Sequence, residues 1–209
     1  ERLRQLFAGV TPPAAYSPIS LGMGEPRHPT PQFIKDALSN NLSGLASYPA
    51  TAGELGLREA FTRWLNLRYA ITLDPATQVL PVNGSREALF SFAQTIIDPS
   101  KGQPLVVCPN PFYQIYEGAA LLAGAAPYYA ASDPARNFAV NWDAVPDSVW
   151  QRTQLLFVCS PGNPTGAVMP LTEWKKLFEL SDRYGFVIAS DECYSEIYFR
   201  DEPPLGGLQ

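Results

Sequence analysis

The chain has 209 residues, of which 46% are hydrophobic and 17% are charged, so it carries enough apolar side chains for the core of one or two domains. Its formal net charge of −5 gives no broad attraction to phosphate backbones or anionic lipid, and we expect neither nucleic acid nor a membrane as a partner. The apolar runs are too short to span a bilayer, and the 3 cysteines form no CxxC pair, which favours reduced thiols in the cytoplasm.

The first part of the chain, residues 1–42, is predicted to form an arm. It contains a short helix near Leu3, a Pro-rich loop at residues 11–18, a Gly-rich turn at 22–26 and a helix after Pro31. Residues 53–69 then place Leu57, Phe61 and Trp64 on one face of a predicted helix.

From residue 78 onward, short apolar runs alternate with amphipathic segments. Strands are predicted at residues 78–82, 105–108, around 128, 155–159 and 186–190, and helices at 86–97, 116–122, 142–149 and 171–184. This alternation predicts an α/β fold with a mainly parallel sheet flanked by helices. Ligands of such sheets bind beyond the carboxyl ends of the strands, so the loops that follow the strands are the places to search for a site.

Two of these loops have features that suit a phosphorylated ligand. After residues 78–82, Gly84 and Ser85 open a helix whose free backbone N–H groups and serine hydroxyl suit a phosphate. An ordinary serine N-cap is the alternative. After residues 155–159, a turn with two prolines and two glycines presents the amide of Asn163, and a purely structural turn is the alternative there.

The third loop begins with Asp191, at the end of an apolar strand. Such a carboxylate is costly to bury unless it meets a cation or hydrogen-bond donors, and neighbouring backbone amides are the alternative partners. Because one βαβ unit separates Asn163 from Asp191, both project from one sheet edge. Pyridoxal 5′-phosphate fits all three loops: Asp191 would keep its ring nitrogen protonated, and Asn163 and Tyr194 would hold its phenolate oxygen.

Several segments together resemble the class I/II aminotransferases of fold type I, in the family's order along essentially the whole chain. They are residues 21–26, Tyr48-Pro49 with Gly53 and Leu57-Arg58, and residues 83–89, 109–116, 160–166 and 190–194. Residues 108–118 and 192–198 resemble more narrowly the succinyldiaminopimelate aminotransferases of bacterial lysine biosynthesis. The resemblance implies that residues 1–42 are the arm and a portion of the small domain, and that residues 43–209 are the amino-terminal part of the cofactor-binding large domain.

The resemblance also assigns roles to single residues. Ser85 and Arg86 match positions whose backbone amides hold the cofactor phosphate, and Tyr113 matches the aromatic that stacks on the pyridine ring. Tyr48 matches the tyrosine that reaches the phosphate of the neighbouring subunit, which implies a homodimer. Gly24 matches the glycine whose backbone approaches the substrate carboxylate. Core packing is the alternative for Tyr113 and Tyr48.

The family's Schiff-base lysine has no counterpart in this sequence. The lysines of the chain lie on predicted amphipathic helices or in a Pro/Gly turn, and we expect solvated surface positions for Lys35, Lys101, Lys175 and Lys176. We therefore expect the chain to be the amino-terminal half of the enzyme and to be inactive by itself. With a single histidine, His28, no histidine-rich metal site is expected.

The function that the resemblance implies is amino transfer between N-succinyl-LL-diaminopimelate and 2-oxoglutarate in lysine biosynthesis. Amino acids and 2-oxo acids are thus the expected substrates. Another class I/II aminotransferase or a C–S lyase of the same fold is one alternative. A non-catalytic binding module of this fold is the other, and the missing lysine is its support.

Overall fold

The computed structural model describes residues 2–20, 22, 24–25 and 27–209. Leu21, Met23 and Pro26 of the segment 21–26 therefore lie outside the described residues. The chain divides into two units, Glu1–Tyr48 and Pro49–Gln209, and each is described by itself. The predicted domain boundary after residue 42 stays a prediction.

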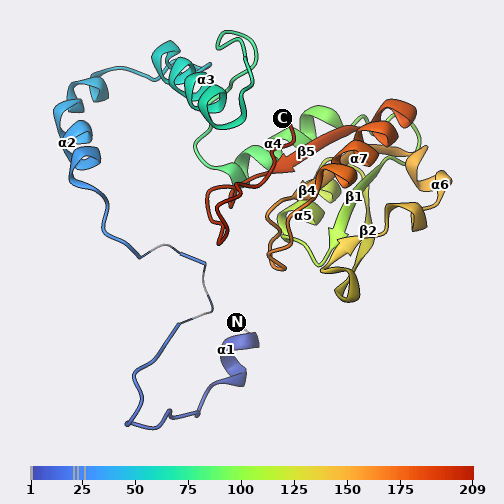
Figure 1. Ribbon diagram of the computed structural model, residues 1–209, viewed down its shortest axis with the longest axis horizontal. Helices are drawn as coiled ribbons and strands as arrows, with labels where there is room; N and C mark the ends of the chain where they lie inside the picture. The colour runs from blue at the N-terminus through green and yellow to red at the C-terminus, as the bar shows by residue number, and fades with distance from the viewer. Residues whose placement is uncertain (1, 21, 23, 26) are drawn as a thin grey trace. The chain divides into compact units, whose positions relative to one another are not determined.

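The first unit is built of short helices joined by extended chain (Figure 1). It contains α1 (Arg2–Leu6), α2 (Gln32–Asn40) and a 3₁₀ helix, η1 (Leu42–Ala46), so the helices predicted near Leu3 and after Pro31 are confirmed. No residue of α2 is buried, and its Phe33 and Leu38 are exposed. None of the described helices combines the length and the apolar composition that crossing a membrane requires.

The second unit is organised around a 5-stranded sheet in the order β3-β2-β1-β4-β5. Its strands are β1 (Leu105–Asn110), β2 (Ala126–Asp133), β3 (Ala139–Val140), β4 (Thr153–Cys159) and β5 (Val187–Asp191). The pairs β1 with β2, β1 with β4 and β4 with β5 are parallel, and only β2 with β3 is antiparallel. The predicted α/β fold with a mainly parallel sheet is confirmed.

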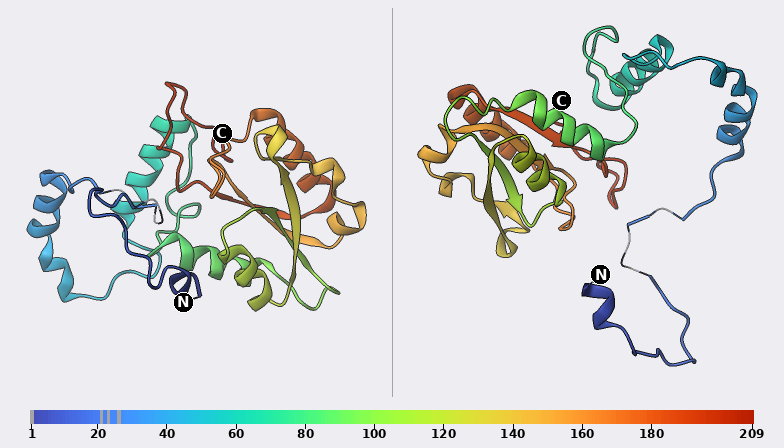
Figure 2. Two further views of the ribbon diagram at one scale, coloured as in Figure 1. Left: turned by 90° about the horizontal axis from the view of Figure 1, so that it is seen from below. Right: turned by 180° about the vertical axis from the view of Figure 1, so that it is seen from behind.

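Helices cover both faces of this sheet (Figures 1 and 2). The helices of the unit are α3 (Leu55–Tyr69), α4 (Ser85–Ile96), α5 (Ile115–Leu122), α6 (Asp147–Trp150) and α7 (Leu171–Tyr184), with 3₁₀ turns η2 (Pro134–Arg136) and η3 (Trp142–Ala144). One core lies between the sheet and α4 and α5, and a second lies under η3, α6 and α7. Strands enclosed on both faces are apolar where both faces are covered, which explains the apolar runs at residues 105–108 of β1 and 155–159 of β4.

Two predicted elements differ from the structure. Residues 78–82 form no strand, because no described strand pairs with them, and Leu80 and Val82 are exposed. The helix predicted at residues 142–149 is instead split into η3 and α6, because Pro146 between them cannot donate a helical hydrogen bond.

Candidate functional site

The carboxyl ends of β4 and β5 lie side by side. Cys159 and Asp191 are paired in the parallel register, and the Ser160 N–H donates to the Asp191 carbonyl oxygen at 3.3 Å. The loop that carries Asn163 therefore leaves the sheet at the edge where Asp191 ends β5. This placement confirms the βαβ relationship predicted from the sequence.

Asp191 is buried and its carboxylate has two donors. The Tyr116 hydroxyl donates to Oδ2 at 2.8 Å, and the Cys193 backbone N–H approaches Oδ1 at 3.4 Å. Tyr116 is fully buried, with its ring stacked on Phe157 at 4.7 Å. Burial raises the pKa of the Tyr116 phenol above its ordinary value. The hydroxyl therefore stays protonated and donates a hydrogen bond to Asp191.

Tyr116 was not among the functional residues predicted from the sequence. The available signal was its position in α5, an apolar helix that buries Tyr116 together with Ala119 and Ala120. A buried phenol needs a hydrogen-bond partner, which is a reason to look for an acceptor at the sheet edge.

The start of α4 lies next to the turn that follows Asp191. The Ser85 Oγ is 3.4 Å from the Cys193 Sγ. The N-cap of α4 is Gly84, with a φ of 140° and no side-chain cap hydrogen bond, so the alternative of a serine N-cap is wrong. The first helical bond runs from Ala88 N–H to the Gly84 carbonyl, which leaves the N–H groups of residues 85–87 ahead of it.

This helix start already favours negative charge. Glu87 lies in the first turn, and its own backbone N–H and the guanidinium of Arg86 hold the pKa of its carboxyl below the ordinary value. The Arg86 guanidinium pairs with that carboxylate at 3.1 Å, and both side chains are exposed. The arrangement agrees with an anion site at the amino end of α4.

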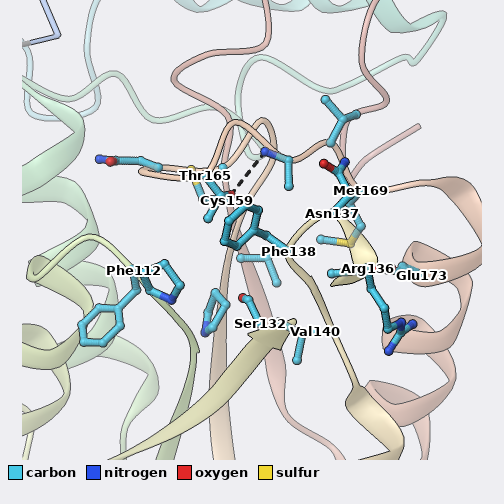
Figure 3. Close-up of a pocket in the computed structure, with 18 of the residues that line it drawn as sticks. Phe112, Ser132, Arg136, Asn137, Phe138, Val140, Cys159, Thr165, Met169 and Glu173 are labelled. Atoms are coloured by element: carbon cyan, nitrogen blue, oxygen red, sulfur yellow. Dashed lines mark hydrogen bonds between the residues drawn. The ribbon is translucent and has the colours of Figure 1, made fainter. Parts of the chain in front are cut away.

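Asn163 lies in a turn that is fixed by its own backbone. Gly162 N–H donates to the Ala167 carbonyl at 2.8 Å, and Gly166 N–H donates to the Gly162 carbonyl at 2.7 Å. Asn163 lines a cavity of about 250 Å³ together with Tyr116 and Cys159. Figure 3 shows this cavity with Phe112 at one side and Arg136 and Glu173 at the other. Asn163 and Tyr194 also line a second cavity, of about 770 Å³.

Tyr194 and the two neighbouring thiols share one electrostatic environment. Burial raises the pKa of Tyr194, and the charges that Cys159, Cys193 and Asp191 can carry add to the rise. Burial likewise raises the pKa of Cys159 to about 11 and raises that of Cys193. Both thiols therefore stay protonated at neutral pH, although Cys193 is exposed.

The remaining predicted site residues lie in both units of the chain. Tyr113 is half-buried at the edge of Tyr116, with ring centroids 6.0 Å apart, so it belongs to the sheet-edge group. Tyr48 and Gly24 lie in the first unit and are exposed, and their predicted roles stay predictions. No cluster of three or more His, Cys, Asp or Glu side chains that could hold a metal occurs in the described part of the chain.

Comparisons with known proteins identify the family. The family model described as "Aminotransferase class I and II" matches residues 16–206. The LL-diaminopimelate aminotransferase of Aquifex aeolicus is 35% identical over 193 residues, which cover 91% of this chain and 49% of that protein.

Two solved structures resemble the chain along most of its length. An aminotransferase from Neisseria meningitidis has a TM-score of 0.92 and 51% identity, over 99% of this chain and 53% of that one. The N-succinyldiaminopimelate aminotransferase from Mycobacterium tuberculosis has a TM-score of 0.82 and 30% identity, over 90% and 48% of the two chains. The chain thus spans about half the length of the relatives that it matches.

Proposed function

The chain belongs to the class I and II aminotransferase family, and from this premise we propose that it forms the cofactor-binding part of an aminotransferase that uses pyridoxal 5′-phosphate. Its fold is fold type I, as the sequence resemblance implied. The observation that carries the proposal is the buried Asp191 carboxylate at the end of β5, with the hydroxyl of Tyr116 on one oxygen and the start of α4 beside the turn that follows Asp191.

The chemistry of this group of residues fits the proposed cofactor. A carboxylate supports a protonated pyridine nitrogen, and Tyr116 fixes that carboxylate in one orientation. The backbone N–H groups of Ser85 and Arg86 hold the phosphate at the helix start. When bound, pyridoxal phosphate supplies an electron sink for negative charge at the α-carbon of the substrate.

Three further residues complete the proposed cofactor site. Asn163 and Tyr194 donate to the phenolate oxygen from neighbouring loops, and both line the cavity of about 770 Å³. Tyr113 stacks on the ring, because a π-face attracts a cationic ring. In a homodimer, Tyr48 reaches the phosphate of the neighbouring subunit, and Gly24 offers its backbone to the substrate carboxylate. A cytoplasmic location, favoured by the cysteine usage, belongs to the same proposal.

The proposed substrate is an amino acid of the diaminopimelate type, with 2-oxoglutarate as the amino acceptor. The support is the names of two relatives, one an LL-diaminopimelate aminotransferase and the other an N-succinyldiaminopimelate aminotransferase. Of the two substrates, we propose N-succinyl-LL-diaminopimelate, on the resemblance of residues 108–118 and 192–198.

The test has a binding step and a kinetic step. The protein encoded by the full gene is titrated with pyridoxal phosphate by absorbance, and amino transfer to 2-oxoglutarate is then compared for N-succinyl-LL-diaminopimelate and LL-diaminopimelate. Asp191→Asn should lower turnover by a factor on the order of 10², as for other preorganised charged groups. Asp182→Asn, at an exposed position of α7, is the matched control. Failure of the wild-type protein to bind the cofactor would refute the proposal.

A further inference from the structure

The carboxyl end of α3 forms hydrogen bonds to the turn that carries Tyr194. From α3, Arg68 donates through Nε to the Glu196 Oε1 at 2.7 Å, and through Nη2 to the Ser195 carbonyl at 3.4 Å and the Pro204 carbonyl at 3.2 Å. One guanidinium thus connects Ser195, directly after Tyr194, with Pro204, which lies in a loop further along the chain.

A second anchor holds the other side of the same turn. The Glu192 Oε1 accepts from the Ser190 hydroxyl at 2.8 Å and from the Gly207 N–H at 2.7 Å. The Glu192 carbonyl accepts from the Ser195 N–H at 3.1 Å, which closes the turn around Tyr194. The Tyr69 hydroxyl lies 3.5 Å from the Glu192 Oε2, so α3 reaches this anchor as well.

The Arg68 side chain is largely withdrawn from solvent. Only 12% of it is exposed, and its guanidinium carbon lies 4.4 Å from the centroid of the buried Tyr69 ring. A planar guanidinium serves this position because it donates in several fixed directions at once, which a lysine ammonium cannot do. Its bonds to backbone carbonyls fix the main chain, whereas an exposed ion pair alone contributes little.

We propose that Arg68 and Glu192 are positioning residues that hold the Tyr194 phenol in place at the sheet edge. The inference rests on the proposed function, because the group that Tyr194 would meet is the phenolate oxygen of the cofactor. Residues 192–196 belong to no helix or strand. The side-chain contacts therefore add to the backbone hydrogen bonds of the turn in fixing its position. A hydrogen bond to the cofactor tolerates only a few tenths of an ångström of displacement.

The first experiment asks whether Arg68 acts through Tyr194. In the full-length protein loaded with pyridoxal phosphate, absorbance is followed against pH for the wild type, Arg68→Gln, Tyr194→Phe and the double variant. A donor to the cofactor's phenolate oxygen stabilises the deprotonated, charged form of that oxygen. Loss of the donor should therefore raise the midpoint pH of the absorbance change by about half to one pH unit in both single variants. The double variant should shift no further than Tyr194→Phe alone.

Arg63→Gln is the matched control, because Arg63 lies on the same helix and is exposed. Its midpoint should equal that of the wild type. The inference would be overturned if Arg68→Gln had the same midpoint pH as the wild type. It would also be overturned if Arg68→Gln shifted the midpoint as much in the Tyr194→Phe protein as in the wild type.

A second measurement needs no cofactor, so it separates this inference from the proposed function. 3-Fluorotyrosine is placed at position 194 and its ¹⁹F resonance is recorded in the unloaded protein. We expect one narrow resonance in the wild type and in Arg63→Gln, and a shifted, broadened one in Arg68→Gln and Glu192→Leu while circular dichroism shows that they stay folded. An unchanged resonance in both variants would refute the positioning role even if the cofactor binds.

Discussion

The Tyr116 hydroxyl donates a hydrogen bond of 2.8 Å to Asp191 across 75 residues of sequence, and both side chains are buried. Tyr116 belongs to α5, which follows β1, whereas Asp191 ends β5, and β4 lies between β1 and β5 in the sheet. The stack of the Tyr116 ring on Phe157 fixes the donor before any ligand arrives. The carboxylate is therefore preorganised by the core itself.

Replacing Tyr116 with Phe should weaken cofactor binding more than it weakens the fold. The ring and its packing remain, but one oxygen of a buried carboxylate loses its donor, which costs about 1–3 kcal/mol. We expect the dissociation constant for pyridoxal phosphate, measured by absorbance titration, to rise about tenfold.

Tyr184→Phe is the control for this substitution. It also removes a tyrosine–aspartate hydrogen bond, of 3.0 Å to Asp147, but this bond is exposed to solvent and lies on the side of the sheet covered by α7. It should change the free energy of unfolding by no more than about 0.5 kcal/mol. Equal losses of cofactor affinity in the two variants would mean that Tyr116 has no special role.

A second prediction concerns Gly84 at the start of α4. Its φ of 140° is unfavourable for any other residue, and a Cβ there would lie 2.7 Å from the Glu87 Oε2. Gly84→Ala should therefore destabilise the protein by about 1 kcal/mol or more and disturb the proposed phosphate site.

The matched control is Gly56→Ala in the first turn of α3, where a Cβ meets nothing within 4 Å. There the added methyl should raise stability by about 0.5–1 kcal/mol, because alanine favours a helix. Urea unfolding of the two variants gives both values. A stabilising Gly84→Ala would contradict the strained conformation at this position.

Local patterns were sufficient to predict most of the second unit. The run of α7 from Leu171 to Tyr184 matches its prediction, because Trp174 and Leu177 recur on one buried face and Gly185 ends the helix with a φ of 78°. The shared edge of Asn163 and Asp191 was also predictable, since parallel strands joined by one helix must end at the same side.

Partners that are distant in sequence were beyond these patterns. The acceptor of Tyr116 lies 75 residues away and the Gly207 donor of Glu192 lies 15 residues away, and nothing in their local sequence specifies these pairs. Residues 78–82 show the opposite error: the run has the composition of a strand, but a strand exists only through hydrogen bonds to a neighbour, and the described sheet provides none there.

The raised thiol pKa of Cys159 predicts slow alkylation. The thiolate is the reactive form, and a pKa of about 11 in place of 9.0 leaves about a hundredth of the usual thiolate fraction at neutral pH. Labelling of Cys159 by iodoacetamide should therefore increase about tenfold per pH unit up to pH ~11.

The exposed Cys193 provides the internal comparison for this labelling. Peptide mass spectrometry at pH 8 should find Cys193 modified before Cys159, because burial restricts access to Cys159 as well as raising its pKa. Rapid modification of Cys159 at pH 7 would show that the sheet edge is more open than the structure indicates.

The positions of the lysines predict that the 209-residue chain does not catalyse amino transfer by itself. Lys101 pairs with Asp98 at 3.7 Å, beyond the carboxyl end of α4, and Lys176 pairs with Asp143. Lys175 is exposed on α7, and Lys35 is exposed on α2 in the first unit.

No lysine of the second unit is thus in contact with the group formed by Asp191, Tyr116 and Ser85 in the described structure. Borohydride, which fixes pyridoxal phosphate to a nearby amine, should therefore label the lysines of the isolated chain only weakly and without preference. Amino transfer should be undetectable in the same sample. Stoichiometric labelling of a single lysine would contradict this prediction, because a Schiff base of that yield requires an amine held at the cofactor aldehyde.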